Sequence, residues 1–134
     1  MGDKLDIRST PCKPPEADEV VIKNRAWIIN PVNWILQQTS LFNGLNYPLI
    51  LGGDIAGEVV EVGSGVTRFK KGNRAPEIPL GLGLSKPSEG GFQLYSIVHA
   101  VLAASVLDSM SYTEAPYSLC VCPRPPAASS SKIT

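Results

Sequence analysis

The stretch YPLILGGDIAGEVVEVGSGV, residues 47–66, decides the fold class of this chain. Its segment 49–62 is rich in β-branched residues, which favour a largely buried strand. The glycines at Gly52-Gly53 and Gly57 indicate bulges or a close backbone approach within that strand. Gly63-Ser64-Gly65 then predicts a tight turn. We therefore expect a long strand that ends in a turn.

The residues before this stretch predict a strand followed by a helix. Residues 20–29 are mainly β-branched and aromatic, as in a largely buried strand. Asn30 is a favourable helix cap, and the proline after it suits the first helical position. A short helix is therefore expected over residues 31–38, with its apolar face, carrying Trp34 and Ile35, packed inward.

The residues after this stretch predict more turns and another strand. Residues 69–73 carry a turn signal, and residues 92–98 alternate in polarity after Gly90-Gly91. The chain holds 12 glycines and 12 prolines, above average usage of about 7% and 5%, and this excess favours many turns over long helices. Short strands between glycine turns predict a mainly β fold, a sandwich or barrel, with one or two short helices.

Three zones differ in composition and predict the domain organisation. Residues 1–18 are polar and proline-marked, and we expect an extended N-terminal lead. Residues 19–115 hold nearly all the apolar side chains and are expected to fold as the domain. Residues 116–134 are rich in proline and serine and are expected to form a disordered tail. A capping box over residues 111–114 predicts a helix, which the first proline of the tail interrupts.

Charge and apolar patterning exclude several classes of partner. With 12 basic and 12 acidic side chains the net charge is zero, which leaves no electrostatic footprint for nucleic acid or anionic lipid. The first residues contain no apolar signal-peptide core, and the longest apolar stretch, residues 97–107, is too short to span a bilayer. We expect no nucleic-acid partner, no membrane partner and a cytoplasmic location. The three cysteines, odd in number, are expected to be reduced thiols.

Other candidate chemistry in the chain has a simpler structural explanation. The glycine motifs at residues 63–68 and 81–86 lack the third glycine of a dinucleotide fingerprint and are expected to be turns. Cys120 and Cys122, with the single His99, lack the paired ligand spacing of a zinc site. His99 itself, flanked by apolar residues, is expected to be packed and hydrogen-bonded. The sequence therefore predicts no catalytic acid or base and no metal ligand.

Residues 47–66 strongly resemble the N-terminal segment of medium-chain dehydrogenases/reductases. Further matching segments follow the family's order, namely residues 19–23, 29–34, 69–74 and 90–95. The resemblance covers roughly residues 14–115 and is closest to the zinc-type alcohol dehydrogenase-like and trans-acting enoyl reductase group. It implies a GroES-like, partly open β-barrel over residues 19–115.

The resemblance also implies a cofactor site. In the zinc enzymes of this superfamily a cysteine and a His-Glu pair hold the catalytic zinc, but here those places are residues 30–33 and Gly53-Asp54. The resemblance therefore points to the zinc-free branch of quinone and enoyl reductases, with no metal. In that branch an Asn-Pro-x-Asp segment lies at the cleft and contacts NADPH. The implied cofactor-binding residues are Asn30, Pro31, Val32 and Asn33, where Asn33 replaces the common aspartate.

The extent of the resemblance shapes the expected function. Family members continue into a Rossmann domain with a glycine-rich loop, whereas this chain diverges at Pro116, so no Rossmann domain is expected in it. The resemblance implies a truncated NADPH-dependent oxidoreductase of small carbonyl or enone substrates. It is expected to be inactive alone, because hydride transfer needs the nicotinamide at near-attack distance.

Two alternatives remain at the level of the sequence. One is a non-catalytic binding module that associates through an exposed barrel face with itself, as a homo-oligomer, or with a full-length relative. The other is a chain whose exposed strand edges lead to aggregation.

Overall fold

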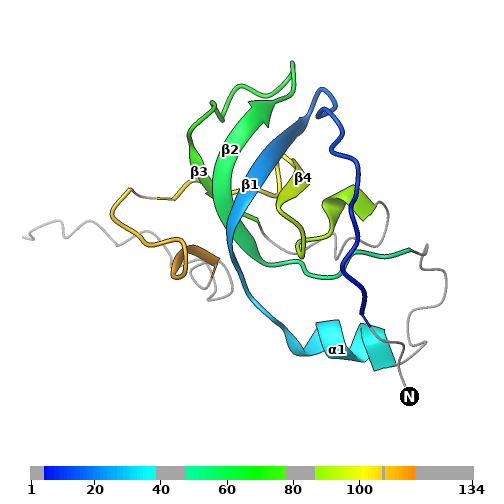
Figure 1. Ribbon diagram of the computed structural model, residues 1–134. Helices are drawn as coiled ribbons and strands as arrows, with labels where there is room; N and C mark the ends of the chain where they lie inside the picture. Colours follow the sequence, from blue (N-terminus) through cyan, green and yellow to red (C-terminus); the bar gives the residue numbers. More distant parts are fainter. Residues whose placement is uncertain (1–4, 39–47, 78–86, 107, 117–134) are drawn as a thin grey trace, which may run out of the picture.

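The computed structural model describes residues 5–38, 48–77, 87–106 and 108–116, and Figure 1 shows their arrangement. The elements in chain order are β1 (Glu19–Trp27), α1 (Pro31–Gln38), β2 (Ile55–Val62), β3 (Arg74–Pro76), the 3-10 helix η1 (Pro87–Glu89) and β4 (Tyr95–His99). The strands form one antiparallel four-stranded sheet in the order β3-β2-β1-β4. The expected mainly β fold with one or two short helices is confirmed.

The sheet curls because its two central strands are not regular. The pairing of β1 with β2 shifts register twice, between Val21 and Ile22 and between Asn24 and Ala26. Such bulges bend a strand and increase its twist. At the edge of the sheet, Glu77 bridges Ala103, so the segment after β4 returns to the end of β3. The sheet therefore closes part of the way towards a barrel.

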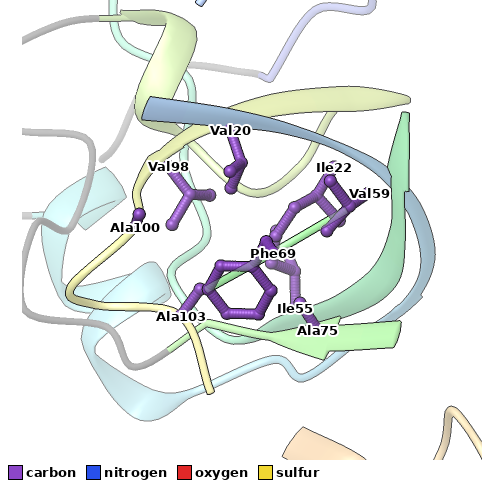
Figure 2. Close-up of a cluster of buried hydrophobic side chains, with 9 residues drawn as sticks. All are labelled: Val20, Ile22, Ile55, Val59, Phe69, Ala75, Val98, Ala100 and Ala103. Carbon is purple, nitrogen blue, oxygen red and sulfur yellow. The ribbon is translucent and has the colours of Figure 1, made fainter. Parts of the chain in front are cut away.

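A cluster of apolar side chains fills the inside of the curled sheet, as Figure 2 shows. It comprises Val20, Ile22, Ile55, Val59, Phe69, Ala75, Val98, Ala100 and Ala103. All four strands contribute to it, and Phe69 enters from the turn between β2 and β3. Burial of these side chains is the main force that holds the strands together.

The strand expected over residues 49–62 forms only in its second half. β2 begins at Ile55, and Gly52 has a φ of +93°, which an extended strand does not allow. The carbonyl oxygens of Leu51 and Gly52 instead accept hydrogen bonds from the N–H groups of Phe92 (2.8 Å) and Gly91 (2.7 Å). The expected bulge or close approach at the double glycine is thus an irregular pairing of two loops.

The strand expected over residues 92–98 also begins late. β4 starts at Tyr95, because the chain bends after Gly91, where the Gln93 N–H donates to the Gly91 carbonyl oxygen at 2.7 Å. The turns predicted around Gly63 and over residues 69–73 are present, with bonds from Val66 N–H to Gly63 O (3.1 Å) and, in the second turn, from Asn73 N–H to Lys70 O (3.0 Å).

The helix α1 has the predicted bounds but not the predicted inward face. Asn33 and Leu36 are its buried residues, whereas Trp34 is 58% exposed. Positions 33 and 36 are three apart and therefore lie on one side of a helix, and Trp34 falls about a quarter turn away. The expectation that Trp34 packs inward is wrong.

The described residues before β1 and after β4 have the local structure that the sequence predicts. Residues 5–16 form neither helix nor strand, as expected for an extended lead. The capping box is complete, because the Glu114 N–H donates to Ser111 Oγ (3.2 Å) and the Ser111 N–H to Glu114 Oε2 (3.1 Å). The expected disordered tail lies outside the described residues from position 117 onwards. In the described ranges, no helix is long and apolar enough to cross a membrane.

Candidate functional site

The four residues implied in cofactor binding form one turn at the start of α1. The Asn30 N–H donates to Asn33 Oδ1 (2.7 Å), and the Asn33 N–H donates to the Asn30 carbonyl oxygen (2.9 Å). Asn33 therefore fixes the turn with its side chain, and Asn30 stands at the expected cap position directly before α1, with its side-chain amide bonded to Asp54. Pro31 is exposed and Val32 is half-buried on the outside of the same turn.

Asp54 attaches this turn to the segment that leads into β2. The Asn30 side-chain amide donates to Asp54 Oδ2, and the Ile28 N–H donates to the Asp54 carbonyl oxygen at 3.0 Å. Asp54 is only 2% exposed, so its end of these bonds is shielded from water, which strengthens them. Sequence reasoning did not place Asp54 in the site. A carboxylate inside an otherwise apolar run was the signal that could have found it.

Asn33 has a hydrogen-bond donor that the fold does not use. The residue is 4% exposed, and among the described groups its Nδ2 is a buried nitrogen without a partner. Buried polar atoms are almost always paired in folded proteins, and exceptions call for an explanation. An acceptor atom supplied by a bound molecule would satisfy this donor.

A seam of backbone hydrogen bonds lies beside the turn. We call it the glycine seam: residues 51–52 and residues 91–92, joined by the two bonds given above. The Phe92 ring lies against Gly52, where an added Cβ would be 2.4 Å from the Phe92 Cδ1 atom. Gly52 is therefore required both for its positive φ and for the space that the ring occupies.

Two side chains of β1 attach the end of that strand to the glycine seam. The Asn24 side-chain amide donates to the carbonyl oxygens of Gly91 (3.1 Å) and Gln93 (2.9 Å) and to Ser96 Oγ (2.8 Å). The Trp27 indole N–H donates to the same Gly91 carbonyl oxygen at 2.8 Å. Sequence reasoning missed both roles, because an isolated polar residue in a strand does not reveal its partner.

Glu77 places a buried carboxyl group at the end of β3. Burial, together with the nearby carboxylates of Glu89 and Asp54, raises the pKa of Glu77 to about 9, and burial is the largest of these causes. Its Oε2 is a buried atom without a hydrogen-bond partner. Across the described ranges, no group of three or more His, Cys, Asp or Glu side chains is arranged to hold a metal ion. The three carboxyl groups therefore share an electrostatic environment without forming a cation site.

A groove of about 370 Å³ lies at the opposite end of β1 from Asn30. Its lining residues are Asp18, Gly65, Val66, Thr67, Arg68, His99, Ala100 and Val101. His99 is exposed there, and its Nδ1 accepts from the Val101 N–H at 3.3 Å. The expectation that His99 is packed is wrong, because it is the last residue of β4 and points out of the sheet.

The arrangement at the start of α1 is suited to binding and orienting a molecule. Asn30 and Asn33 are neutral, and the carboxylate of Asp54, which bonds to Asn30, is buried. The described side chains of this turn therefore offer hydrogen bonds and apolar contact rather than an exposed acid or base. The expectation of no catalytic acid or base stays a prediction.

Comparison with known proteins gives matches over most of the chain. Residues 16–108 match the family described as alcohol dehydrogenase GroES-like domain. The dehydrogenase pigH of Monascus ruber is 40% identical over 115 residues, which cover 83% of this chain and 31% of that protein. The trans-enoyl reductase himH of Aspergillus japonicus is 41% identical over 97 residues, which cover 72% of this chain and 28% of that protein. The chain thus spans just under a third of these curated relatives.

A solved structure agrees with the family match. The quinone oxidoreductase of Escherichia coli, complexed with NADPH, superimposes with a TM-score of 0.70 at 27% identity. The superposition covers 82% of this chain and 31% of that chain. The similarity lies in the barrel that carries the turn at the start of α1.

Proposed function

The chain belongs to the alcohol dehydrogenase GroES-like domain family, and from this premise we propose that it forms the substrate side of the cleft of an NADPH-dependent, zinc-free reductase of enone or carbonyl compounds. The GroES-like barrel and the resemblance to medium-chain dehydrogenases/reductases expected from the sequence are confirmed. The relatives are oxidoreductases, namely a dehydrogenase, a trans-enoyl reductase and a quinone oxidoreductase. The cofactor and the substrate class of this chain are part of the proposal.

The observation that carries the proposal is the fixed turn formed by Asn30, Pro31, Val32 and Asn33. Asp54 holds its first residue, and the Asn33 amide retains an unused buried donor. These features fit the amide and hydroxyl acceptors of a nicotinamide nucleotide, which supplies a hydride when bound. In the proposal, the four residues bind and orient the cofactor, and the apolar side chains around them exclude water.

A second part of the proposal concerns the chain by itself. Transfer of a hydride requires cofactor and substrate to be held together in a near-attack geometry. The barrel provides one wall of such a site, and the proposal assigns the other wall to a coenzyme-binding domain. We therefore expect the chain alone neither to bind NADPH tightly nor to reduce an enone.

The experiment is a domain exchange. Residues 14–115 replace the matching segment of the Escherichia coli quinone oxidoreductase, and NADPH oxidation is followed with a panel of enones and carbonyl compounds, beside the chain alone. We expect turnover only in the chimera. Asn33→Ala in the chimera is expected to raise the KM for NADPH about tenfold through the lost hydrogen bond, whereas Lys71→Ala, in an exposed turn, leaves it unchanged.

Two results would contradict the proposal. A folded chimera that binds no NADPH and reduces none of the compounds would remove the assignment of the turn to the cofactor. Turnover by the chain alone would show that the second wall is not needed. Circular dichroism of every variant separates these results from failure to fold.

A second candidate function rests on exposed apolar side chains. Ile29 is 81% exposed, Leu94 71% and Trp34 58%. Such a surface is typical of a protein-binding site, and it favours a non-catalytic module that associates with a second copy or with a full-length relative. Sedimentation velocity over a range of concentrations tests self-association, and a monomer at every concentration would count against it.

A further inference from the structure

Two aromatic side chains stand at the glycine seam outside the apolar core. Trp27 is 42% exposed and Phe92 is 36% exposed, although both are held in place by the backbone around them. Neither belongs to the cluster that fills the barrel. Large aromatic side chains that are both exposed and fixed are typical of binding surfaces rather than of structural ones.

The position of Trp27 leaves its exposed surface purely apolar. Its one polar group, the indole N–H, donates to the Gly91 carbonyl oxygen at 2.8 Å. That oxygen also accepts from the Asn24 amide, so its position is fixed by two donors. The remaining exposed part of the ring offers a flat π surface that has already lost its rotational freedom, which lowers the entropic cost of binding.

The position of Phe92 is fixed by a different contact. Its ring lies against the Cα of Gly52, and its N–H donates to the Leu51 carbonyl oxygen at 2.8 Å. Because Gly91 belongs both to the Trp27 hydrogen bond and to the glycine seam, the two aromatic residues are attached to the same short piece of backbone. Their relative position is therefore set by main-chain geometry.

The aromatic pair is close to the proposed cofactor turn. Trp27 is the last residue of β1, and Asn30 follows three residues later. Between them, the Ile28 N–H binds the same Asp54 that holds the Asn30 side chain. A molecule that rests on the aromatic pair would therefore lie beside the turn that is proposed to orient the cofactor.

We propose that Trp27 and Phe92 form a stacking surface for the flat, conjugated part of the organic substrate, so that this domain favours aryl-conjugated enones over non-aromatic ones. This inference rests on the proposed function and names its substrate class. Stacking on aromatic side chains requires a flat π system in the ligand, and such contacts change affinity by about fivefold to tenfold.

The chain offers a direct probe, because it contains two tryptophans, Trp27 and Trp34. Trp34→Phe leaves Trp27 as the single indole emitter, and Trp27→Phe leaves Trp34 as the matched control. Both proteins are titrated without NADPH with benzylideneacetone and with its cyclohexyl analogue, which has the same enone group but no aromatic ring. An unchanged intact protein mass after the titration excludes covalent addition of the enone to a thiol.

The expected result is saturable quenching of the Trp34→Phe protein by benzylideneacetone, with about fivefold to tenfold weaker binding of the cyclohexyl analogue. The Trp27→Phe protein should show only linear, collisional quenching. Phe92→Leu on the Trp34→Phe background should weaken benzylideneacetone binding while circular dichroism stays unchanged. Because Trp34→Phe does not touch the aromatic pair, this measurement holds even if Trp27→Phe fails to fold.

Equal affinities for the two enones, or linear quenching in both proteins, would overturn the inference. A blue shift of Trp27 emission with protein concentration, before any ligand is added, would also overturn it by showing that a second copy covers the pair. The fluorescence titration and the turnover assay give independent answers. If the chimera is active but no saturable quenching is seen, only the stacking surface is refuted. If quenching is saturable but the chimera is inactive and binds no NADPH, only the reductase proposal is refuted.

Discussion

Glu77 shows how a single residue can make the stability of this domain depend on pH. Its carboxyl group is 5% exposed, and its pKa is raised to about 9. In the unfolded chain the same group ionises near its ordinary pKa of 4.5. The folded state therefore binds the proton more tightly. The stabilising contribution is complete below about pH 4.5 and is lost as the pH rises towards about 9.

We predict that Glu77→Gln removes most of this dependence. Each unit of pKa difference corresponds to about 1.4 kcal/mol, so the wild-type free energy of unfolding should fall by several kcal/mol between about pH 5 and about pH 8.5. The glutamine variant keeps the size of the side chain but cannot ionise. Urea unfolding at both values checks the prediction, and parallel pH profiles of the two proteins would refute it.

Gly57 is a second residue on which the central strand pair depends. A Cβ added there would lie 2.2 Å from the Lys23 carbonyl oxygen, so β1 and β2 would have to separate. We predict that Gly57→Ala lowers the free energy of unfolding by about 3 kcal/mol or more. The matched control is Gly72→Asn. Gly72 has open space around it and a φ of +88°, which asparagine tolerates, so it should change stability by less than about 1 kcal/mol.

The test compares the unfolding temperatures of the Gly57→Ala and Gly72→Asn variants. If Gly57→Ala unfolds at the same temperature as Gly72→Asn, the close approach of the strands is not required.

The sequence indicated a special role for Gly57, because a glycine inside a β-branched run suggests a close approach. It contained no comparable signal for Glu77, since the burial of that carboxyl group depends on the fold of distant segments.

Among the elements, α1 is held at its start by its own Asn33 side chain as well as by Asp54. Asn33 Oδ1 accepts the Asn30 N–H at 2.7 Å, and the side chain is buried. Asn33→Ala would leave that N–H without its partner, and we predict a loss of about 1–2 kcal/mol of stability. Gln38→Ala, at the exposed end of the same helix, should have almost no effect. The prediction is tested by measuring the urea concentration at which each variant is half unfolded. Equal concentrations for the two variants would show that Asn33 does not fix the helix.

The bounds of the elements show what could be predicted from sequence. The helix 31–38 and the turns were predictable because proline fixes φ, asparagine favours a cap position and glycine adopts the positive φ of a turn. The late starts of β2 and β4 were not, because Gly52 and Gly91 pair with each other across the fold. Residues 30–33 were proposed as a site from their resemblance to a family motif, but their link to Asp54, 24 residues away from Asn30, was not predictable from the sequence. That the turn binds a cofactor stays a prediction.

At the scale of the whole molecule, the curled sheet is closed by backbone contacts between β3 and the segment after β4, among them the bond from the Val106 N–H to the Arg74 carbonyl oxygen at 3.4 Å. The Ala104 N–H donates to the Pro76 carbonyl oxygen at 3.0 Å, beside the bridge between Glu77 and Ala103. These contacts join the segment after β4 to β3 and enclose the apolar cluster. The fold class was predictable from strand and turn signals, whereas this closure was not, because few signals mark residues 103–104 in the sequence.

We predict that Ala104→Pro opens this edge of the barrel. Proline removes the N–H group and with it the hydrogen bond to Pro76. The expected outcome is a loss of about 1–3 kcal/mol together with faster amide exchange at Val106, whose N–H donates to the Arg74 carbonyl oxygen at 3.4 Å in the same contact. Ser105→Pro is the control, because Ser105 is exposed one residue further on. Hydrogen exchange followed by mass spectrometry distinguishes the two, and identical exchange would argue against closure through this contact.

The glycine seam has a consequence for protein engineering. It joins two loops through main-chain atoms of Gly52 and Gly91. The side chains of Asn24, Trp27 and Phe92 hold it from the side, whereas the Leu94 side chain is exposed. Directed evolution could therefore randomise the exposed side chains of Ile29 and Leu94 in a combinatorial library while Trp27, Phe92 and the two glycines stay fixed. The scaffold would be inherited unchanged by every library member, and each variant would report on ligand preference rather than on folding.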